Sequence, residues 1–383
     1  MSYYFLGTRL GHLSLGKFSE AYLSQKFNNK IEVLALNLES YPFVTAKLRV
    51  NDTAMLLLKG NTQEEHINLH YHLTAQHFKW NKYSTNKPLD LKGTIRGKRS
   101  ELLIKGKGNA FEGRTDYFFT KKPHTIESMN IAFSKINAEE FLRFLHMKTK
   151  LKGKIDLNIT QGYYNKSTAL MSSNYRLKAY HYGGFSSTGQ MKYEHKSFSF
   201  KGKSTSYGGV INYDYVNKKL KAKLKGVSLK KLLKQFSFPQ ILQAKLHGVI
   251  SYDSKEKVVF FNTQLKEARF RRTNLTALLK KVTGMDLLQD IYDKSIFIGQ
   301  YQASVLTAVL QLEDGTNHLY LNEIHMYAKT NRVNANFNIL IHQQELIGKI
   351  GGTLQDPKVN LDISRLLQYQ IQKKSKSFLK RFF

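Results

Sequence analysis

The chain has 383 residues, and its 60 lysines and arginines against 28 aspartates and glutamates give a formal net charge of +32. An apolar fraction of 41% and an aromatic fraction of 12% exclude disorder as the main state, because enough apolar surface can be buried to offset the entropy of ordering. The absence of cysteine excludes disulfide scaffolds, cysteine–zinc sites, iron–sulfur clusters and thiol nucleophiles.

The first part of the sequence predicts a helix followed by strands. The helix covers residues 18–27, and strands follow at residues 31–38 and 44–50. At residues 67–73 apolar side chains alternate with polar ones. Because successive side chains of a strand point to opposite faces, these strands are expected to bury one face and to expose the other.

Two motifs in this part resemble chemical sites only weakly. Four residues of one predicted strand share a face in a pattern that can chelate a metal: Glu64, His66, His70 and His72. We favour the interpretation that they form a polar strand face in water, since their spacing along one strand is weak evidence for a metal site. Residues 108–115 imitate a phosphate-binding loop, but Arg114 stands where that loop needs lysine, and the flanks predict strands. We therefore expect no catalytic residue, no metal and no cofactor, and a protein that is not an enzyme.

A unit of strand, short helix and glycine-bearing strand occurs twice, 91 residues apart. Residues 136–145 align with residues 227–236, and the strands that follow carry Gly153 and Gly248. Helices are predicted at residues 138–145 and 228–236, and a degenerate third copy has one at residues 274–281. Residues 285–292 predict a further helix. Repetition of one supersecondary unit indicates a sheet that grows along one axis.

The strictest alternation lies at residues 219–225, where Leu220, Ala222 and Leu224 stand between four lysines. We expect the three apolar residues to face the interior and the lysines to face water. Residues 151–159 and 333–341 alternate similarly. The uncharged run at residues 295–312 contains three glutamines, which are costly in hydrocarbon, so we interpret it as strands and not as a membrane span.

The last segment, residues 363–383, carries six basic residues and no acidic one, with apolar residues at helical spacing. It predicts a basic amphipathic helix, of which residues 366–371 are expected to cap the open end of the sheet and residues 373–383 to contact a membrane or a partner. The residues expected at that contact are Lys373, Lys374, Lys376, Phe378, Leu379, Lys380, Arg381, Phe382 and Phe383.

These elements predict a mainly β protein: an elongated, curved antiparallel β-sheet, open as a groove or sandwich-like, with a few short helices and a C-terminal amphipathic helix. Antiparallel strands are favoured because a parallel sheet would show continuous apolar runs and regular helices between strands. The chain divides into an N-terminal segment (residues 1–50), a repeated strand and short-helix domain (residues 51–362) and the C-terminal helix (residues 363–383).

Three segments carry a resemblance to a known family. They are the repeat, residues 18–50, and residues 347–362, where a glycine-rich strand, a turn at Asp356 and Pro357 and an alternating strand follow one another. Together they resemble the AsmA-like family of Gram-negative cell envelopes, which includes AsmA and the longer TamB- and YhdP-type proteins. Residues 18–50 resemble the stretch that follows the inner-membrane anchor in these proteins.

The resemblance implies a half-open β-groove that shields lipid acyl chains between the two envelope membranes. The expected function is non-enzymatic binding or conduction of phospholipid in support of outer-membrane assembly. Phospholipid and anionic membrane surfaces are the expected partners, with other envelope proteins as a further one. The expected location is periplasmic, with an inner-membrane anchor helix upstream of Met1.

The residues expected to line the groove are the apolar members of three predicted strands: Leu151, Ile155, Leu157, Ile159, Leu220, Ala222, Leu224, Val333, Phe337 and Ile339. One alternative is a closed β-rich scaffold or interaction protein without a lipid ligand, since alternation also describes a sandwich. Another is a basic nucleic-acid-binding protein, which we disfavour because lysines are spread over almost every strand.

Overall fold

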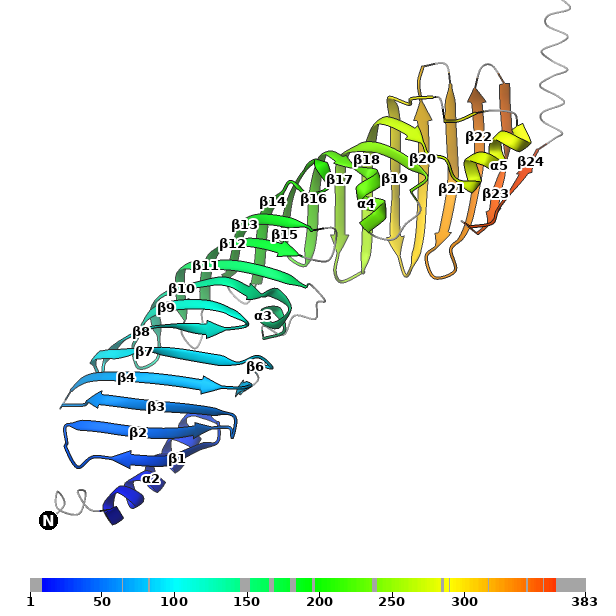
Figure 1. Ribbon diagram of the computed structural model, residues 1–383. Coiled ribbons are helices and arrows are strands. Elements are labelled where there is room, and N and C mark those ends of the chain that lie inside the picture. The colour runs from blue at the N-terminus through cyan, green and yellow to red at the C-terminus, as the bar shows by residue number, and fades with distance from the viewer. Residues whose placement is uncertain are drawn as a thin grey trace, which may run out of the picture. The chain divides into compact units, whose positions relative to one another are not determined.

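The computed structural model describes residues 9–63, 65–81, 83–144, 152–164, 169–179, 184–194, 197–235, 240–283, 286–288, 290–315, 317–341, 344–353 and 355–362. In the described residues the fold is mainly β, as predicted: 22 strands form a large antiparallel sheet, and short helices lie between them (Figure 1). The chain divides into two compact units, residues 1–200 and residues 201–383. The predicted C-terminal helix, residues 363–383, lies outside the described residues.

The helices are α2 (Arg9–Phe27), α3 (Ala138–Phe144), α4 (Leu229–Gln235) and α5 (Asn274–Thr283), with a 3-10 turn η1 (Ser206–Gly208). The strands of the first part are β1 (Ile31–Asn37), β2 (Phe43–Val50), β3 (Ala54–Asn61), β4 (His66–Ala75), β5 (Phe78–Trp80), β6 (Tyr83–Thr85), β7 (Leu89–Lys98), β8 (Glu101–Ala110), β9 (Gly113–Lys121), β10 (Ile126–Asn137), β11 (Gly153–Tyr164), β12 (Ala169–Ala179) and β13 (Ser186–Glu194). The remaining strands are β14 (Ser197–Ser204), β15 (Val210–Val216), β16 (Lys219–Ser228), β17 (Leu242–Asp253), β18 (Val258–Phe270), β19 (Lys294–Gln302), β20 (Val305–Glu313), β21 (His318–Tyr327), β22 (Arg332–Ile341), β23 (Gln344–Gly352) and β24 (Pro357–Leu361).

Within each unit the sheet is a meander. Each strand pairs antiparallel with its neighbour in the sequence, and the β5–β6 hairpin is a separate excursion between β4 and β7. Several hairpins turn through two residues that both have positive φ, which matches the twist of the flanking strands. These pairs are Asn51 and Asp52, Phe111 and Glu112, Asn217 and Lys218, and Ala303 and Ser304.

The predicted alternation at residues 219–225 is confirmed in β16. Its four lysines are exposed, whereas Leu220 and Ala222 are partly buried and Leu224 is buried. The uncharged run at residues 295–312 forms β19 and β20, as expected. Within the described part of the chain, no helix has the length and apolar character that crossing a membrane requires.

The internal repeat is visible in the backbone as a β-bulge. Lys135 and Gly226 stand 91 residues apart, and both have positive φ, 52° and 68°. At each, the pairing register with the following strand shifts, because one extra residue is inserted. The next residues, Ile136 and Val227, are fully buried. The bulge therefore turns an exposed strand position into a core position just before the short helix.

Each bulge is followed by a helix start. The side-chain oxygen of Asn137 accepts hydrogen bonds from the backbone N–H groups of Glu139 and Glu140, at 3.0 and 3.2 Å, and so caps α3. Ser228 stands at the same place before α4. The third copy has its bulge at Glu267 (φ 53°), followed by the fully buried Ala268.

The prediction of a helix at residues 285–292 is wrong for the last residues of that range, which the structure describes as non-helical. Tyr292 forms an isolated bridge with Ala268, and each backbone N–H donates to the carbonyl of the other residue. Tyr292 is fully buried, and its ring meets Phe270 edge-on. Burial of this side chain beside β18 outweighs the local helical spacing.

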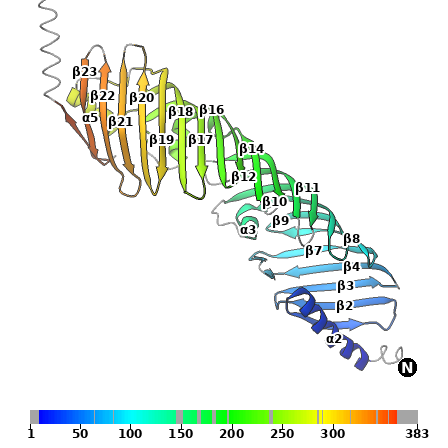
Figure 2. The ribbon, with the colours of Figure 1, turned by 180° about the vertical axis from the view of Figure 1, so that it is seen from behind.

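Helices cover particular edges of each unit. In unit 1, α2 lies against β1 (Figure 2), and α3 contacts β6, β10 and β11. In unit 2, α4 lies against β16 and β17, and α5 contacts β24 (Figure 1). The side-chain amide of Asn274 donates to the Gln355 carbonyl at 3.2 Å. These contacts bring segments that are distant in sequence against the meander.

The positive φ of Lys135 leads to a prediction about backbone strain. Lys135→Gly should raise the free energy of unfolding by about 1 kcal/mol, because glycine adopts positive φ without the penalty of a Cβ atom. The matched control is Ser134→Gly, one residue earlier and exposed with ordinary backbone, which should lower stability. Urea denaturation followed by circular dichroism measures both. Equal destabilisation by the two variants would contradict the bulge.

Candidate functional site

The most informative surface of unit 1 is the inward side of its meander, here called the apolar face. It is built from alternate residues of neighbouring strands that lie in register, so that they form rows across the sheet. One row consists of Leu69, Ile95, Ile104, Phe119 and Met129, from β4, β7, β8, β9 and β10. Apolar side chains therefore stand side by side over five strands.

Burial changes along the strands of the apolar face. At one end lies a row of buried residues, Ala54, Ala75, Leu89 and Ala110. Farther along the same strands, the row of Leu69, Ile95 and Ile104 is only partly buried. A closed sandwich core would bury both rows alike, so the face is covered at one end and accessible at the other.

The covered end owes its burial to α3 and the β5–β6 hairpin. Phe111, from the β8–β9 turn, packs its ring against Phe141 and Phe144 of α3 at 5.5 and 5.2 Å between centroids, and against Phe133 of β10 at 6.1 Å. Trp80 and Phe78 of β5 belong to the same cluster. These aromatic contacts anchor α3 over the ends of the strands.

Between the two rows lies a row with tyrosines and glycines. Tyr71, Gly93, Gly106 and Tyr117 occupy directly paired positions of β4, β7, β8 and β9. The two tyrosine hydroxyls are hydrogen-bonded to each other. An added Cβ on Gly106 would stand 2.5 Å from the Tyr117 hydroxyl. Because Gly93 and Gly106 have no side chain, the two tyrosine side chains can lie directly over their backbone. In this arrangement aromatic rings cover a patch of the sheet that lacks side chains.

The tyrosine pair is the polar element of this otherwise apolar row. Burial raises the pKa of Tyr117, and its hydrogen bond to Tyr71 raises it further. Burial also raises the pKa of Tyr71. Both hydroxyls are therefore neutral at physiological pH and satisfy each other, so the row offers apolar ring surface without a charge.

The predicted groove residues fall on the expected side of their strands, but most are packed inside. Six are buried: Ile155, Leu157, Ile159, Leu224, Phe337 and Ile339. Leu220, Ala222 and Val333 are partly exposed. Leu151 and the membrane-contact residues at 373–383 lie outside the described residues. The structure brings Ile155, Leu157 and Ile159 together in the core of unit 1, and it places the other described candidates in unit 2.

The accessible apolar residues of β7, β8 and β9 were missed by the sequence analysis. Ile95, Ile104 and Phe119 stand beside glycines, threonines and lysines, which hide their alternation. The signal that could have found them is the glycine spacing, since Gly93 and Gly106 lie two residues from Ile95 and Ile104.

The two weak motifs form no site in the described residues. His66 and His70 are exposed on β4, and no group of three or more metal-ligating side chains occurs in the part of the chain that the structure describes. Residues 108–115 form the β8–β9 hairpin. A hairpin provides no helix N-terminus for a phosphate, so the phosphate-loop interpretation has no support there.

The tyrosine–glycine row makes a prediction about packing. Gly106→Ala should lower the free energy of unfolding by about 1–3 kcal/mol, because the new methyl group must displace the tyrosine rings. Gly16→Ala in α2 is the control, since its Cβ would meet only Val33, at 3.6 Å, an ordinary contact. Urea denaturation compares the two. Equal midpoints would show that the rings do not lie over Gly106.

Comparison of the chain with protein-family models, with curated proteins and with solved structures gives no match.

Proposed function

We propose that this chain is an AsmA-like protein that binds phospholipid without chemistry of its own, with acyl chains lying along the apolar face of unit 1. The observation that carries the proposal is the accessible end of that face. Apolar side chains of five consecutive strands stand in one row there and remain partly exposed. Apolar surface of this extent is typical of sites that bind apolar ligands.

The charge around this end supports a lipid with an anionic headgroup. Lys98 and Arg99, where β7 ends, are exposed, and Lys121 ends β9. All three lie at the end of the strands opposite to α3. Acyl chains on the apolar face would therefore place a phosphate near cations, and each such contact with an anionic lipid contributes about 1 kcal/mol.

The repeated bulge and short helix support the family proposal. The repeat and the closing β23–β24 hairpin are two of the three segments on which the resemblance rests. With the family comes the proposed setting: a periplasmic protein anchored in the inner membrane that supports outer-membrane assembly. Co-fractionation of the natural gene product with inner membranes would test the setting separately from lipid binding.

The lipid proposal is tested by a charge on the apolar face. Ile104→Asp should reduce phosphatidylglycerol bound per protein by about tenfold, since an acyl chain cannot solvate a carboxylate. The matched control is Leu103→Asp, the preceding residue of β8, which is 39% exposed on the opposite face. Native mass spectrometry counts the bound lipid, and circular dichroism checks the fold. Equal loss in both variants, or none in either, would contradict the proposal.

A milder pair of variants keeps the test valid if Ile104→Asp does not fold. Trp80 is the single tryptophan of the chain, so Trp80→Phe gives a silent background. In that background, Phe119→Trp places an indole on the apolar face, and Phe118→Trp places one on the opposite face, where Phe118 is 38% exposed. Lipid with brominated acyl chains should quench the first fluorophore much more than the second. Equal quenching would mean that chains do not lie on the apolar face.

A further inference from the structure

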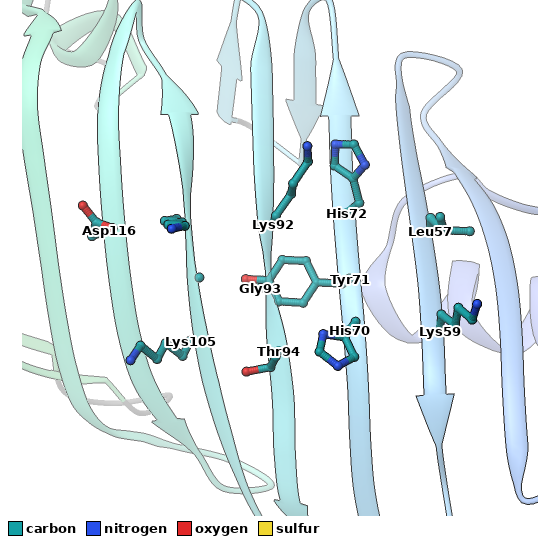
Figure 3. Close-up of a pocket in the computed structure, with 12 residues that line it drawn as sticks. Leu57, Lys59, His70, Tyr71, His72, Lys92, Gly93, Thr94, Lys105 and Asp116 are labelled. Atoms are coloured by element: carbon teal, nitrogen blue, oxygen red, sulfur yellow. The ribbon is translucent and has the colours of Figure 1, made fainter.

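The opposite side of the same strands carries an open depression of about 620 Å³ (Figure 3). Its floor is the backbone of Tyr71, Gly93 and Gly106, whose register positions point toward the apolar face. Its two walls are side chains of residues immediately before and after this row. One wall consists of Lys59, His70, Thr94 and Lys105, and the other of Leu57, His72, Lys92 and Lys107 with Asp116 at its end.

The centre of the depression is a rectangle of side chains on β7 and β8. Lys92 lies directly opposite Lys107, and Thr94 lies directly opposite Lys105. Paired residues of neighbouring strands are about 5 Å apart, and residues two positions apart on one strand are about 7 Å apart. Three lysines and one threonine thus flank the Gly93–Gly106 floor, and lysine side chains are long and flexible enough to bring their ammonium groups to one phosphate there.

The pairing of Lys92 with Lys107 is unfavourable by itself. Like charges at directly opposed positions of an antiparallel pair destabilise the sheet. His72 stands on the other side of Lys92 in the same row and is bonded to Asp90, with 2.8 Å between Nε2 and Oδ1. Asp116 lies directly opposite Lys107 on β9, but no ion pair joins these two side chains in the described residues. A local arrangement that costs stability without a visible structural gain is typical of a functional site.

Some lysines of unit 1 are paired with a carboxylate, and the four lysines of the depression are not. Lys30, Lys87, Lys122 and Lys192 each form an ion pair with a carboxylate at 2.5–3.0 Å. In the described part of the chain, none of Lys59, Lys92, Lys105 and Lys107 forms such a pair. Their charge is therefore available to an anion from outside.

We propose that this depression is an anion site for a phosphomonoester or diphosphate group. The multivalent phosphate would lie on the Gly93–Gly106 floor, held by Lys92, Lys105 and Lys107 with the Thr94 hydroxyl. This chemistry occurs both in the headgroup of a phosphorylated lipid and in a free phosphate compound. The site stands on the opposite face of the sheet from the apolar face, so it does not depend on the acyl-chain proposal.

The test removes two charges from the centre of the site. Pyrophosphate is titrated into the full chain by calorimetry, and vesicles of phosphatidylcholine with and without phosphatidic acid are tested by sedimentation. Lys92→Gln with Lys107→Gln should weaken binding by about tenfold or more, because two charge-assisted contacts are lost. Lys223→Gln with Lys225→Gln is the matched control, since it removes the same charge from exposed positions of β16 and should change binding less than about twofold. Lys92→Arg with Lys107→Arg keeps the charge and should retain binding.

The outcomes separate the source of the phosphate from the existence of the site. Binding of free pyrophosphate that is lost in the first variant supports a soluble ligand. Binding only to phosphatidic acid vesicles, lost in the same variant, supports a lipid headgroup. Equal losses in the glutamine variant and its control would show a general effect of net charge and overturn the proposal. The proposal is also overturned if neither pyrophosphate nor phosphatidic acid vesicles bind the native chain.

Discussion

Antiparallel pairing of each strand with its neighbour in the sequence is the constraint on which the rest of the structure depends. Tight hairpins fix the register, so that the parity of a residue decides which face of the sheet it occupies. Tyr71 and His72 are adjacent on β4, yet the first is hydrogen-bonded to Tyr117 on the apolar face and the second lies beside Lys92 on the opposite face. A slip of one residue would exchange the two environments over every strand involved.

At a β-bulge the register shifts by one residue, and the following residues change face. If Lys135 kept the regular pleat of β10 and did not form a bulge, Ile136 would fall on the exposed side of the strand, and α3 would start from the wrong face. The unfavourable φ of a lysine is thus offset by a fully buried isoleucine and by a helix that covers the strand ends. At Gly226 the same geometry has no such strain, because glycine lacks a Cβ atom.

Much of this fold can be predicted from the sequence, because alternation, turn residues and the repeat are local signals. The strands at residues 219–225 and 295–312, and the short helices α3 and α4, follow from spacing alone. The accessible part of the apolar face does not. Which end is covered depends on Phe111 meeting Phe141, 30 residues later, and alternation is the same in covered and uncovered rows. The hydroxyl pair of Tyr71 and Tyr117 joins residues 46 positions apart, and only the shared register of four strands reveals it.

The sequential meander also bears on how such a sheet forms and how it can change. Loop closure is cheap when every ladder joins neighbours in sequence, so folding within a unit can begin at any stable hairpin and spread strand by strand. The same locality makes the 91-residue repeat a natural unit of duplication. A further copy would need a compatible partner only at its two edge strands, so the lineage of such a chain can widen its sheet by whole repeats while the interior packing of older repeats is preserved.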